Sequence, residues 1–249
     1  MRKVFGIHNA FSMIRYKTRE VVSIDLSESR NDRRIRQIEK LATEQGIPVR
    51  RIASEVMNEA SEGVRHQGVI LTCRSEKLRP SANLNDWFNS LKNQSLLIVL
   101  DSVTDPRNLG ACIRSANSAG ADGVIVSRSR GSPLTATVSH TAAGAAEVTN
   151  LYQASNLARD LENLKKNGIW VIGLDTETSD PIFASDLTHP CALVFGAEDR
   201  GLRAETKKKC DSLISIPMLG DVQSVNVSVA VGIAAFEVVR QRMHAEADG

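Results

Sequence analysis

The chain has 249 residues, of which 42% are hydrophobic and 24% are charged, and its formal net charge is +2. This length allows one large domain or two modest ones, and the composition is that of an ordinary globular protein. The sequence predicts no membrane span, since no apolar run approaches about 20 residues. It predicts no signal peptide either, since the N-terminus lacks an apolar core.

The cysteines indicate the redox environment of the chain. Cys73, Cys112, Cys191 and Cys210 show no CxxC spacing, and three of them lie in apolar or periodic segments. This pattern predicts reduced, mostly buried thiols in a cytoplasmic protein that holds no metal.

Positive charge is concentrated in the first third of the sequence. Residues 1–79 carry 16 Lys and Arg against 10 Asp and Glu, whereas the remainder carries 15 against 19. A basic segment on a nearly neutral chain suggests an anionic partner, although most charge runs are only solvated helix faces.

Residues 1–75 are typical of a small α/β unit. Strands are expected at Val21–Ile24, Val49–Ile52 and Gly68–Leu71, and the pattern from Asp32 to Gln45 predicts a helix that Gly46 ends. Arg30, Arg33, Arg34 and Arg36 lie near the start of this helix, where positive charge opposes the helix dipole. A phosphate partner would explain the arrangement, and we favour that interpretation over one of ordinary surface arginines.

A domain boundary is predicted between Ser75 and Asn93. The segment contains the turn cluster Pro80-Ser-Ala-Asn and then a short amphipathic piece around Leu84, Trp87, Phe88 and Leu91. We interpret residues 76–94 as a linker that docks onto the second domain.

From Ser95 onward, strands and helices alternate, which predicts a parallel sheet covered on both faces. Asp105 is the expected N-cap of one helix, with Pro106 in its first turn. Ser155 is the expected cap of a second helix that ends at Gly168. A long helix should run from Val229 to about Met243. The expected strands are Leu96–Leu100, Val124–Val126, Ile169–Ile172 and Cys191–Phe195.

Polar residues interrupt the apolar segments near the end of the chain. Glu198 follows a strand closely, and Asn226 and Ser228 stand at the start of the long helix. Each of them alone fits ordinary turn chemistry about as well as a site. Several such loops together favour a ligand site at the carboxyl ends of the strands.

Common catalytic and phosphate-binding signatures are missing, including the P-loop, His-Glu-x-x-His, Gly-x-Ser-x-Gly and a Gly-x-Gly-x-x-Gly after the first strand. The helix after Asp105 instead consists mainly of small residues, with Asn108 and Arg114 among them. A guanidinium in such a closely packing helix is conspicuous. On this evidence alone, Arg114 extending into solvent is an equally good interpretation.

Three motifs follow in order: Asp105-Pro-x-Asn108-x-Gly110-x-x-x-Arg114, Gly196-x-Glu198-x-x-Gly201, and Ser224-Val-Asn226-Val-Ser228-Val-Ala230. Together they resemble the motifs of the SpoU (TrmH) family of RNA ribose 2′-O-methyltransferases, over residues 95–240. Val225 stands where the family more often has Leu. Phe5-Gly-Ile-His8 and His66-Gln-Gly68 resemble the small substrate-binding domain of a subgroup that methylates a guanosine of 23S rRNA.

The resemblance implies an α/β fold in three parts: an L30e-like RNA substrate-binding domain (1–75), the linker (76–94), and a trefoil-knotted, SPOUT-type parallel-sheet domain (95–249). It further implies a homodimer formed through the knotted region and S-adenosylmethionine bound in the knot. Ile233, Phe236 and Val239 of the long helix are available for the dimer interface, or equally for the core. The implied cofactor-binding residues are Gly173, Leu174, Gly196, Ala197, Ile216, Pro217, Met218, Val225 and Ser228.

In this family the residue that matches Arg114 is taken as central to catalysis, sometimes as the general base. Because arginine keeps its proton in proteins, we expect Arg114 instead to hold a phosphate and stabilise the developing alkoxide. Asn108 and Asn226 would orient it or the substrate. Glu198 would either pair with Arg114 or accept the proton of the hydroxyl.

The basic first domain would then bind RNA mainly through its phosphates and shape. The expected contacts are Arg30, Arg33, Arg34 and Arg65. Only Phe5, Phe11 and Tyr16 are aromatic there, which predicts limited base stacking.

Two other functions compete with methylation of rRNA. A tRNA ribose 2′-O-methyltransferase is disfavoured by the His66-Gln-Gly68 domain, because tRNA-specific relatives tend to have short terminal helical extensions instead. A non-catalytic RNA-binding assembly factor is disfavoured because Asn108, Arg114, Glu198 and Asn226 are all intact. A nucleotide-dependent dehydrogenase is a remote third, because its phosphate loop is missing.

Overall fold

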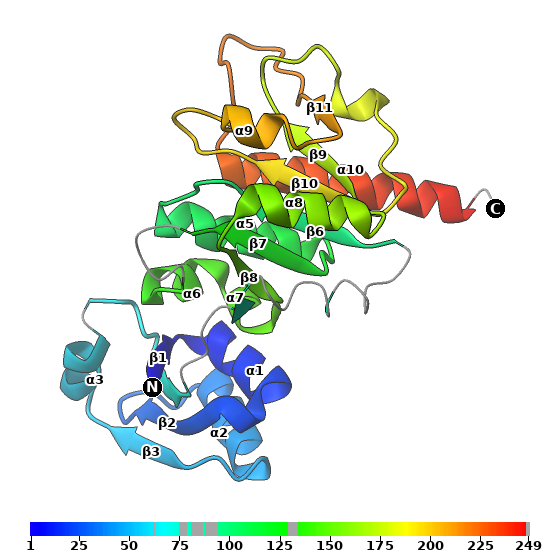
Figure 1. Cartoon of the computed structure of the whole chain (residues 1–249). Coiled ribbons are helices and arrows are strands. Elements are labelled where there is room, and N and C mark those ends of the chain that lie inside the picture. Colours follow the sequence, from blue (N-terminus) through cyan, green and yellow to red (C-terminus); the bar gives the residue numbers. More distant parts are fainter. Residues whose placement is uncertain (62, 75–78, 81–86, 88–93, 129–133, 248–249) are drawn as a thin grey trace. The chain divides into compact units, whose positions relative to one another are not determined.

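The computed structural model describes residues 1–61, 63–74, 79–80, 87, 94–128 and 134–247. Internal contacts divide the chain into two compact units, drawn in Figure 1. Unit 1 comprises Met1–Lys77 and Leu134–Val148, and unit 2 comprises Leu78–Pro133 and Thr149–Gly249. Unit 1 therefore includes a segment that the sequence analysis assigns to the second domain.

Unit 1 contains a four-stranded sheet in the order β1-β4-β2-β3. β2 and β3 are parallel, and the other two pairs are antiparallel. The three expected strands are confirmed as β2, β3 and β4, whereas β1 was not anticipated. The bounds are β1 Arg2–Phe5, β2 Val21–Ser27, β3 Val49–Ile52 and β4 Val69–Cys73.

Helices α1 (Ile7–Tyr16) and α2 (Arg33–Glu44) cover one face of this sheet, and α3 (Ser54–Ser61) packs on the other. The expected helix is confirmed as α2, and its N-cap Asp32 accepts hydrogen bonds from the backbone amides of Arg34 and Ile35. The core of the first face consists of apolar side chains from both helices and alternate strand positions, among them Met13, Ile24, Ile35, Ile38 and Leu71.

The distant segment of unit 1 forms two short helices, α6 (Ala136–Ala142) and α7 (Ala145–Val148). A fully buried carboxylate, Glu147, pairs with Arg2 of β1 at 2.5 Å and accepts a hydrogen bond from Ser139 at 2.9 Å. The Asn9 side chain on α1 donates to the Ser139 carbonyl at 3.2 Å. These buried polar contacts tie the segment to β1 and α1.

Unit 2 contains a seven-stranded sheet in the order β11-β9-β10-β6-β7-β8-β5, in which each neighbouring pair is parallel. The predicted parallel sheet is thus confirmed. Cys191–Phe195 and Leu96–Leu100 form its adjacent central strands and are buried throughout. The bounds are β5 Arg79–Pro80, β6 Leu96–Leu100, β7 Gly123–Ser127, β8 Leu151–Ala154, β9 Trp170–Leu174, β10 Cys191–Phe195 and β11 Ser212–Ile214.

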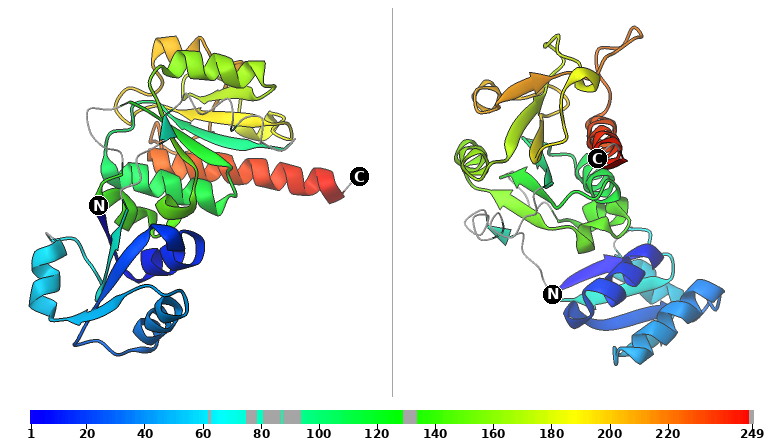
Figure 2. Two further views of the ribbon diagram at one scale, coloured as in Figure 1. Left: turned by 60° about the horizontal axis from the view of Figure 1, so that its bottom comes forward. Right: turned by 90° about the vertical axis from the view of Figure 1, so that its right-hand side faces the viewer.

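Helices cover both faces of this sheet, as Figure 2 shows. α5 (Pro106–Ser118) and α10 (Val227–Ala247) lie on one face, and α8 (Leu157–Lys166) lies on the other. α9 (Ala204–Lys207) and a 3-10 turn, Ile182–Ala184, lie in the loops. The expected long helix is confirmed as α10. The structure describes no helix long and apolar enough to cross a membrane.

The two predicted helix caps have different outcomes. Asp105 caps α5 as expected, accepting from the amide of Arg107. The prediction that Ser155 caps α8 is wrong by one residue, because the side chain of Asn156 accepts from the amide of Arg159 at 3.1 Å. Asn and Ser are comparable N-cap residues, so the sequence could not rank these neighbours.

Most of the predicted linker, including Leu84, Phe88 and Leu91, lies outside the described residues. Trp87 is described, and its ring stacks on Tyr152 of β8 with centroids 4.5 Å apart. At this residue the linker docks on unit 2 as expected. The knot stays a prediction.

Candidate functional site

A cavity of about 360 Å³ lies at the carboxyl ends of β9 and β10, beside the start of α10. Its lining is partly apolar, with charged residues around it. Lys207 of α9 pairs there with Asp175 at 2.6 Å and Glu177 at 2.9 Å, which raises the pKa of the lysine. Six predicted cofactor residues line the cavity: Leu174, Gly196, Ala197, Ile216, Met218 and Val225. Gly173, Pro217 and Ser228 are not part of its lining.

The glycines of the second motif close a tight turn after β10. Ala197 and Gly201 exchange backbone hydrogen bonds of 3.1 and 2.8 Å, and Gly201 has a φ of +62°. A Cβ at Gly196 would lie 2.0 Å from the carbonyl carbon of Gly201. The turn therefore requires glycine at position 196, and it presents Glu198 at its tip.

Gly173 has a packing role outside the cavity lining. A Cβ there would lie 2.6 Å from Leu213 and 2.9 Å from Leu202. The absent side chain lets the loop after β10 and strand β11 approach β9 closely.

Glu198 joins all three sequence motifs through one oxygen. Its Oε1 accepts from the side-chain amide of Asn108 at 2.5 Å and from that of Asn226 at 2.8 Å. Asn226 also donates to Asn108 Oδ1 at 3.1 Å. The three residues come from α5, from the turn after β10 and from the position before α10; Glu198 and Asn226 are exposed, and Asn108 is half-buried. The three motifs therefore meet at one carboxylate oxygen.

Asn226 also caps helix α10. Its Oδ1 accepts from the amide of Ser228 at 2.9 Å and from the Ser228 hydroxyl at 2.6 Å. An asparagine side chain can donate to a carboxylate and accept from a helix end at the same time. Ser228, which was expected to bind the cofactor, is not part of the cavity lining and instead holds the side chain of Asn226.

Arg114 lies on α5 and is exposed. Within the described part of the chain it makes no side-chain hydrogen bond or ion pair. The suggested Arg114–Glu198 pair is not formed, because the two asparagines bind the carboxylate instead. Burial, followed by the charge of Glu198, raises the pKa of nearby Cys112 to about 12, so its thiol stays protonated and is no nucleophile.

Asp101 is a residue of this region that the sequence analysis missed. It directly follows β6, is fully buried, and pairs with Arg203 at 2.6 Å. It also accepts from the hydroxyl of Thr206 on α9 at 2.6 Å. These bonds anchor α9, the helix whose Lys207 lines the cavity. An aspartate directly after a fully apolar strand was the available signal.

The predicted RNA contacts of unit 1 differ in their surroundings. Arg33, Arg34 and Arg65 are exposed. Arg30 instead donates to the Gln67 carbonyl at 2.5 Å and pairs with Asp32 at 2.6 Å. It therefore supports the loop around Gln67.

That loop brings the two N-terminal motifs together. The Gln67 side-chain oxygen accepts from the amide of Ile7 at 3.1 Å, at the start of α1. His66 Nδ1 accepts from the amide of Gly68 at 3.1 Å, and His66 Nε2 lies 2.9 Å from Asn58 Oδ1. Burial, followed by the positive charge of Arg30, lowers the pKa of His66.

The cysteines of the described chain are all free, and three of the four are buried, which confirms the expected thiols. No group of three or more His, Cys, Asp or Glu in that part could hold a metal ion.

Comparison with known families assigns both parts of the chain. Residues 95–236 match the SpoU rRNA Methylase family, and residues 3–78 match the family described as RNA 2′-O ribose methyltransferase substrate binding.

A curated relative aligns over almost the full length. The 23S rRNA (guanosine-2′-O-)-methyltransferase RlmB of Pseudomonas putida is 40% identical over 242 residues, which cover 97% of this chain and 97% of that protein.

Two solved structures bear on the fold. The SpoU methyltransferase AviRb from Streptomyces viridochromogenes, in complex with AdoMet, has a TM-score of 0.79 at 20% identity, covering 97% of this chain and 90% of that one. The A. aeolicus TrmH/SpoU tRNA modifying enzyme has a TM-score of 0.57 at 25% identity. Its alignment covers 67% of this chain and 86% of the TrmH/SpoU chain.

Proposed function

The chain belongs to the SpoU rRNA Methylase family, and we propose from this that it transfers a methyl group from S-adenosylmethionine to the 2′-hydroxyl of a guanosine ribose in 23S rRNA. The observation that carries the proposal is the Asn108–Glu198–Asn226 cluster, in which three separate motifs meet beside a cavity. The relative from Pseudomonas putida supports the choice of substrate.

The cavity suits the cofactor. Its volume of about 360 Å³ falls within the range of about 300–1,000 Å³ of small-molecule sites. Apolar side chains of Leu174, Ile216, Met218 and Val225 would hold the adenosine, and the backbone of Gly196 and Ala197 is available for hydrogen bonds. When bound there, S-adenosylmethionine supplies an electrophilic methyl group on a sulfonium.

Glu198 is the candidate acceptor for the proton of the ribose hydroxyl. Both asparagines donate to its Oε1, and within the described residues Oε2 receives no hydrogen bond. The asparagines hold the carboxylate in one orientation, which favours directed proton transfer. Glu198 thus acts as the base, while Asn108 and Asn226 position it.

Arg114 would bind the substrate. Its exposed guanidinium has no carboxylate partner among the described residues, so it is available to a phosphate of the RNA. A planar, permanently charged fork suits that role and the stabilisation of a developing alkoxide.

Unit 1 would bind the RNA, and Arg33, Arg34 and Arg65 are its exposed candidates. We also propose a homodimer in the cytoplasm, where ribosomal RNA is available. Val229, Phe236 and Met243 of α10 support the dimer, because they recur every seven residues and are each about half exposed or more.

Mapping of ribose methylation in 23S rRNA and tRNA, from cells with and without the gene, tests the function. We expect the loss of one methylguanosine in 23S rRNA, restored by the wild-type gene and not by Arg114→Ala. Because Arg114 is exposed, the variant should melt at the wild-type temperature. Loss of a tRNA mark would identify a tRNA enzyme. No lost mark, with the protein still bound to RNA, would indicate an assembly factor.

A further inference from the structure

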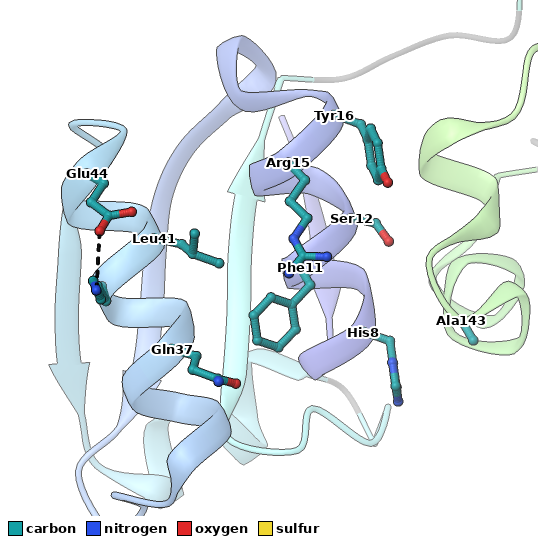
Figure 3. A pocket seen from close by; sticks show the side chains of 10 residues that line it. His8, Phe11, Ser12, Arg15, Tyr16, Gln37, Leu41, Glu44 and Ala143 are labelled. Carbon is teal, nitrogen blue, oxygen red and sulfur yellow. Dashed lines mark ion pairs between the residues drawn. The ribbon is translucent and has the colours of Figure 1, made fainter.

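Unit 1 has a broad groove of about 650 Å³ over helix α1. Figure 3 shows α1 as its floor, with α2 on one side and the turn at Ala143 on the other. We call it the α1 groove, and its lining includes His8, Phe11, Arg15, Tyr16, Gln37 and Lys40.

Two of the three aromatic residues expected in the RNA-binding part lie in this groove. Tyr16 is 71% exposed, whereas Phe11 is half-buried and Phe5 is buried in the core. The guanidinium of Arg15 lies over the Phe11 ring, 5.6 Å from its centroid. The Tyr16 side chain, one residue further along α1, points away from α2, toward the side of α1 on which Ala143 lies (Figure 3).

The walls of the groove are held firmly. Gly144, next to Ala143, approaches α1 so closely that a Cβ there would lie 2.4 Å from the Ser12 hydroxyl. The buried Arg2–Glu147 pair anchors the same segment. An exposed tyrosine alone would need no explanation. Here the exposed Tyr16 ring lines the same groove as the Arg15 guanidinium, which lies over the Phe11 ring.

The charge around the groove is positive. Lys40 pairs with Glu44 at 3.8 Å, so these two largely neutralise each other. Arg15 and, in the first turn of α2, Arg33 and Arg36 have no carboxylate partner within the described part of the chain. Arg33 and Arg36 lie one helical turn before Gln37 and Lys40, on the side of α2 that lines the groove.

We propose that the α1 groove binds an unpaired nucleotide of the RNA substrate. Its base stacks on the Tyr16 ring, and Arg15, with the arginines of α2, contacts the adjacent phosphates. Unpaired bases are the part of RNA that aromatic rings recognise, and a basic groove tracks the backbone beside them. The proposal rests on the proposed function, because it takes RNA as the partner of unit 1. It replaces the expectation of limited stacking with one defined stacking position.

Fluorescence anisotropy of the full-length protein with a labelled single-stranded oligoadenylate tests the groove. We expect Tyr16→Ala to weaken binding about tenfold, within the range found for single stacked bases. Tyr16→Phe, which keeps the ring, should bind like the wild type. Arg15→Ala should reduce the salt dependence of binding by about one phosphate contact. The matched control is Phe183→Ala, since Phe183 is an aromatic residue of unit 2 that is 58% exposed.

Equal affinities of the wild type and Tyr16→Ala, or no measurable binding of the wild type, would overturn the proposal. So would a Tyr16→Ala defect seen only with ribosomal particles and not with RNA, because the groove would then bind a protein. Methylation mapping keeps the two proposals separable. If the wild type methylates 23S rRNA while Tyr16→Ala binds normally, the groove fails and the function stands. If oligoadenylate binding depends on Tyr16 but no methyl transfer occurs, the function fails.

Discussion

Asn226 holds Glu198 and at the same time caps helix α10. One end of its amide donates to Glu198 Oε1 at 2.8 Å, and the other accepts from the amide of Ser228 at 2.9 Å. The carboxylate is therefore connected to the start of the longest helix of the chain. A rigid helix end is a suitable support for a group that must meet a ribose hydroxyl in a fixed orientation.

Glu198→Gln should abolish most methyl transfer without disturbing the site. The glutamine oxygen can still accept from Asn108 and Asn226, whereas the ability to take up a proton is lost. We expect the single-turnover rate to fall by about 10² to 10⁴-fold, with unchanged affinity for S-adenosylmethionine. Calorimetric titration and rapid quench would measure the two quantities. A rate within a few fold of the wild type would remove Glu198 from its role as base.

Gly196→Ala should damage both the cofactor site and the stability of unit 2. The added methyl group would meet the backbone of Gly201 at 2.0 Å, and backbone cannot rotate aside as a side chain would. We expect a loss of about 1–3 kcal/mol in the free energy of unfolding, together with weaker binding of S-adenosylmethionine. Gly220→Ala is the matched control, because no atom lies within 4 Å of the corresponding Cβ. Similar behaviour of both variants would contradict the role of the tight turn.

Arg2→Met should destabilise unit 1 strongly. It would leave the fully buried Glu147 without its cationic partner, and breaking a buried pair in this way costs about 3–5 kcal/mol. Differential scanning calorimetry should show a lower transition temperature for this unit. Lys40→Met removes one partner of the exposed Lys40–Glu44 pair and should change little. An unchanged transition in Arg2→Met would show that the pair contributes nothing to stability.

His66 predicts a pH dependence of unit 1. Its pKa is lowered from 6.5, first by burial and then by Arg30, so the folded state disfavours the protonated ring. The contribution of His66 to the stability of unit 1 is therefore complete above a pH of about 6.5 and is lost as the pH falls below that value. The melting temperature of unit 1 should decline more steeply on acidification in the wild type than in His66→Gln. Identical slopes would show that another group is responsible. His8→Gln, at an exposed histidine, is the control.

The proposed homodimer predicts that a charge on α10 separates the subunits. Phe236 is 50% exposed, and Val229 and Met243 lie two helical turns to either side on the same face. Phe236→Glu should yield monomers in light scattering at concentrations where the wild type is dimeric. His244→Glu, at an exposed site on the same helix, should leave the mass unchanged. A monomeric wild-type protein would contradict the proposal directly.

Four strands of unit 2, namely β6, β7, β9 and β10, could be predicted because each is a short, nearly continuous apolar run, whereas β5, β8 and β11 were not predicted. β1 escaped prediction since Arg2 and Lys3 interrupt its apolar character, and its partner strand lies far along the chain. The return of residues 134–148 to unit 1 depends on contacts such as Arg2–Glu147, 145 positions apart. No local pattern reports a contact of that range.

The candidate site, too, could be predicted only in part. The motif residues were found through their resemblance to a family, and the structure brings Asn108, Glu198 and Asn226 together. Pairing with Arg114 was one of two alternatives for Glu198, and the pair is not formed among the described residues. An exposed guanidinium has many possible orientations, which the sequence does not rank. The buried Asp101 was missed because its partners, Arg203 and Thr206, lie about a hundred residues away along the chain.

Because unit 1 consists of two separate segments of the chain, it cannot be produced as one continuous fragment of the sequence. A fragment that ends at Lys77 would retain the basic helices and lose α6 and α7, so Arg2 and Asn9 would be exposed without Glu147 and Ser139. The substrate-binding part is therefore not a transferable module, and transplanting it onto another enzyme would require the second segment as well.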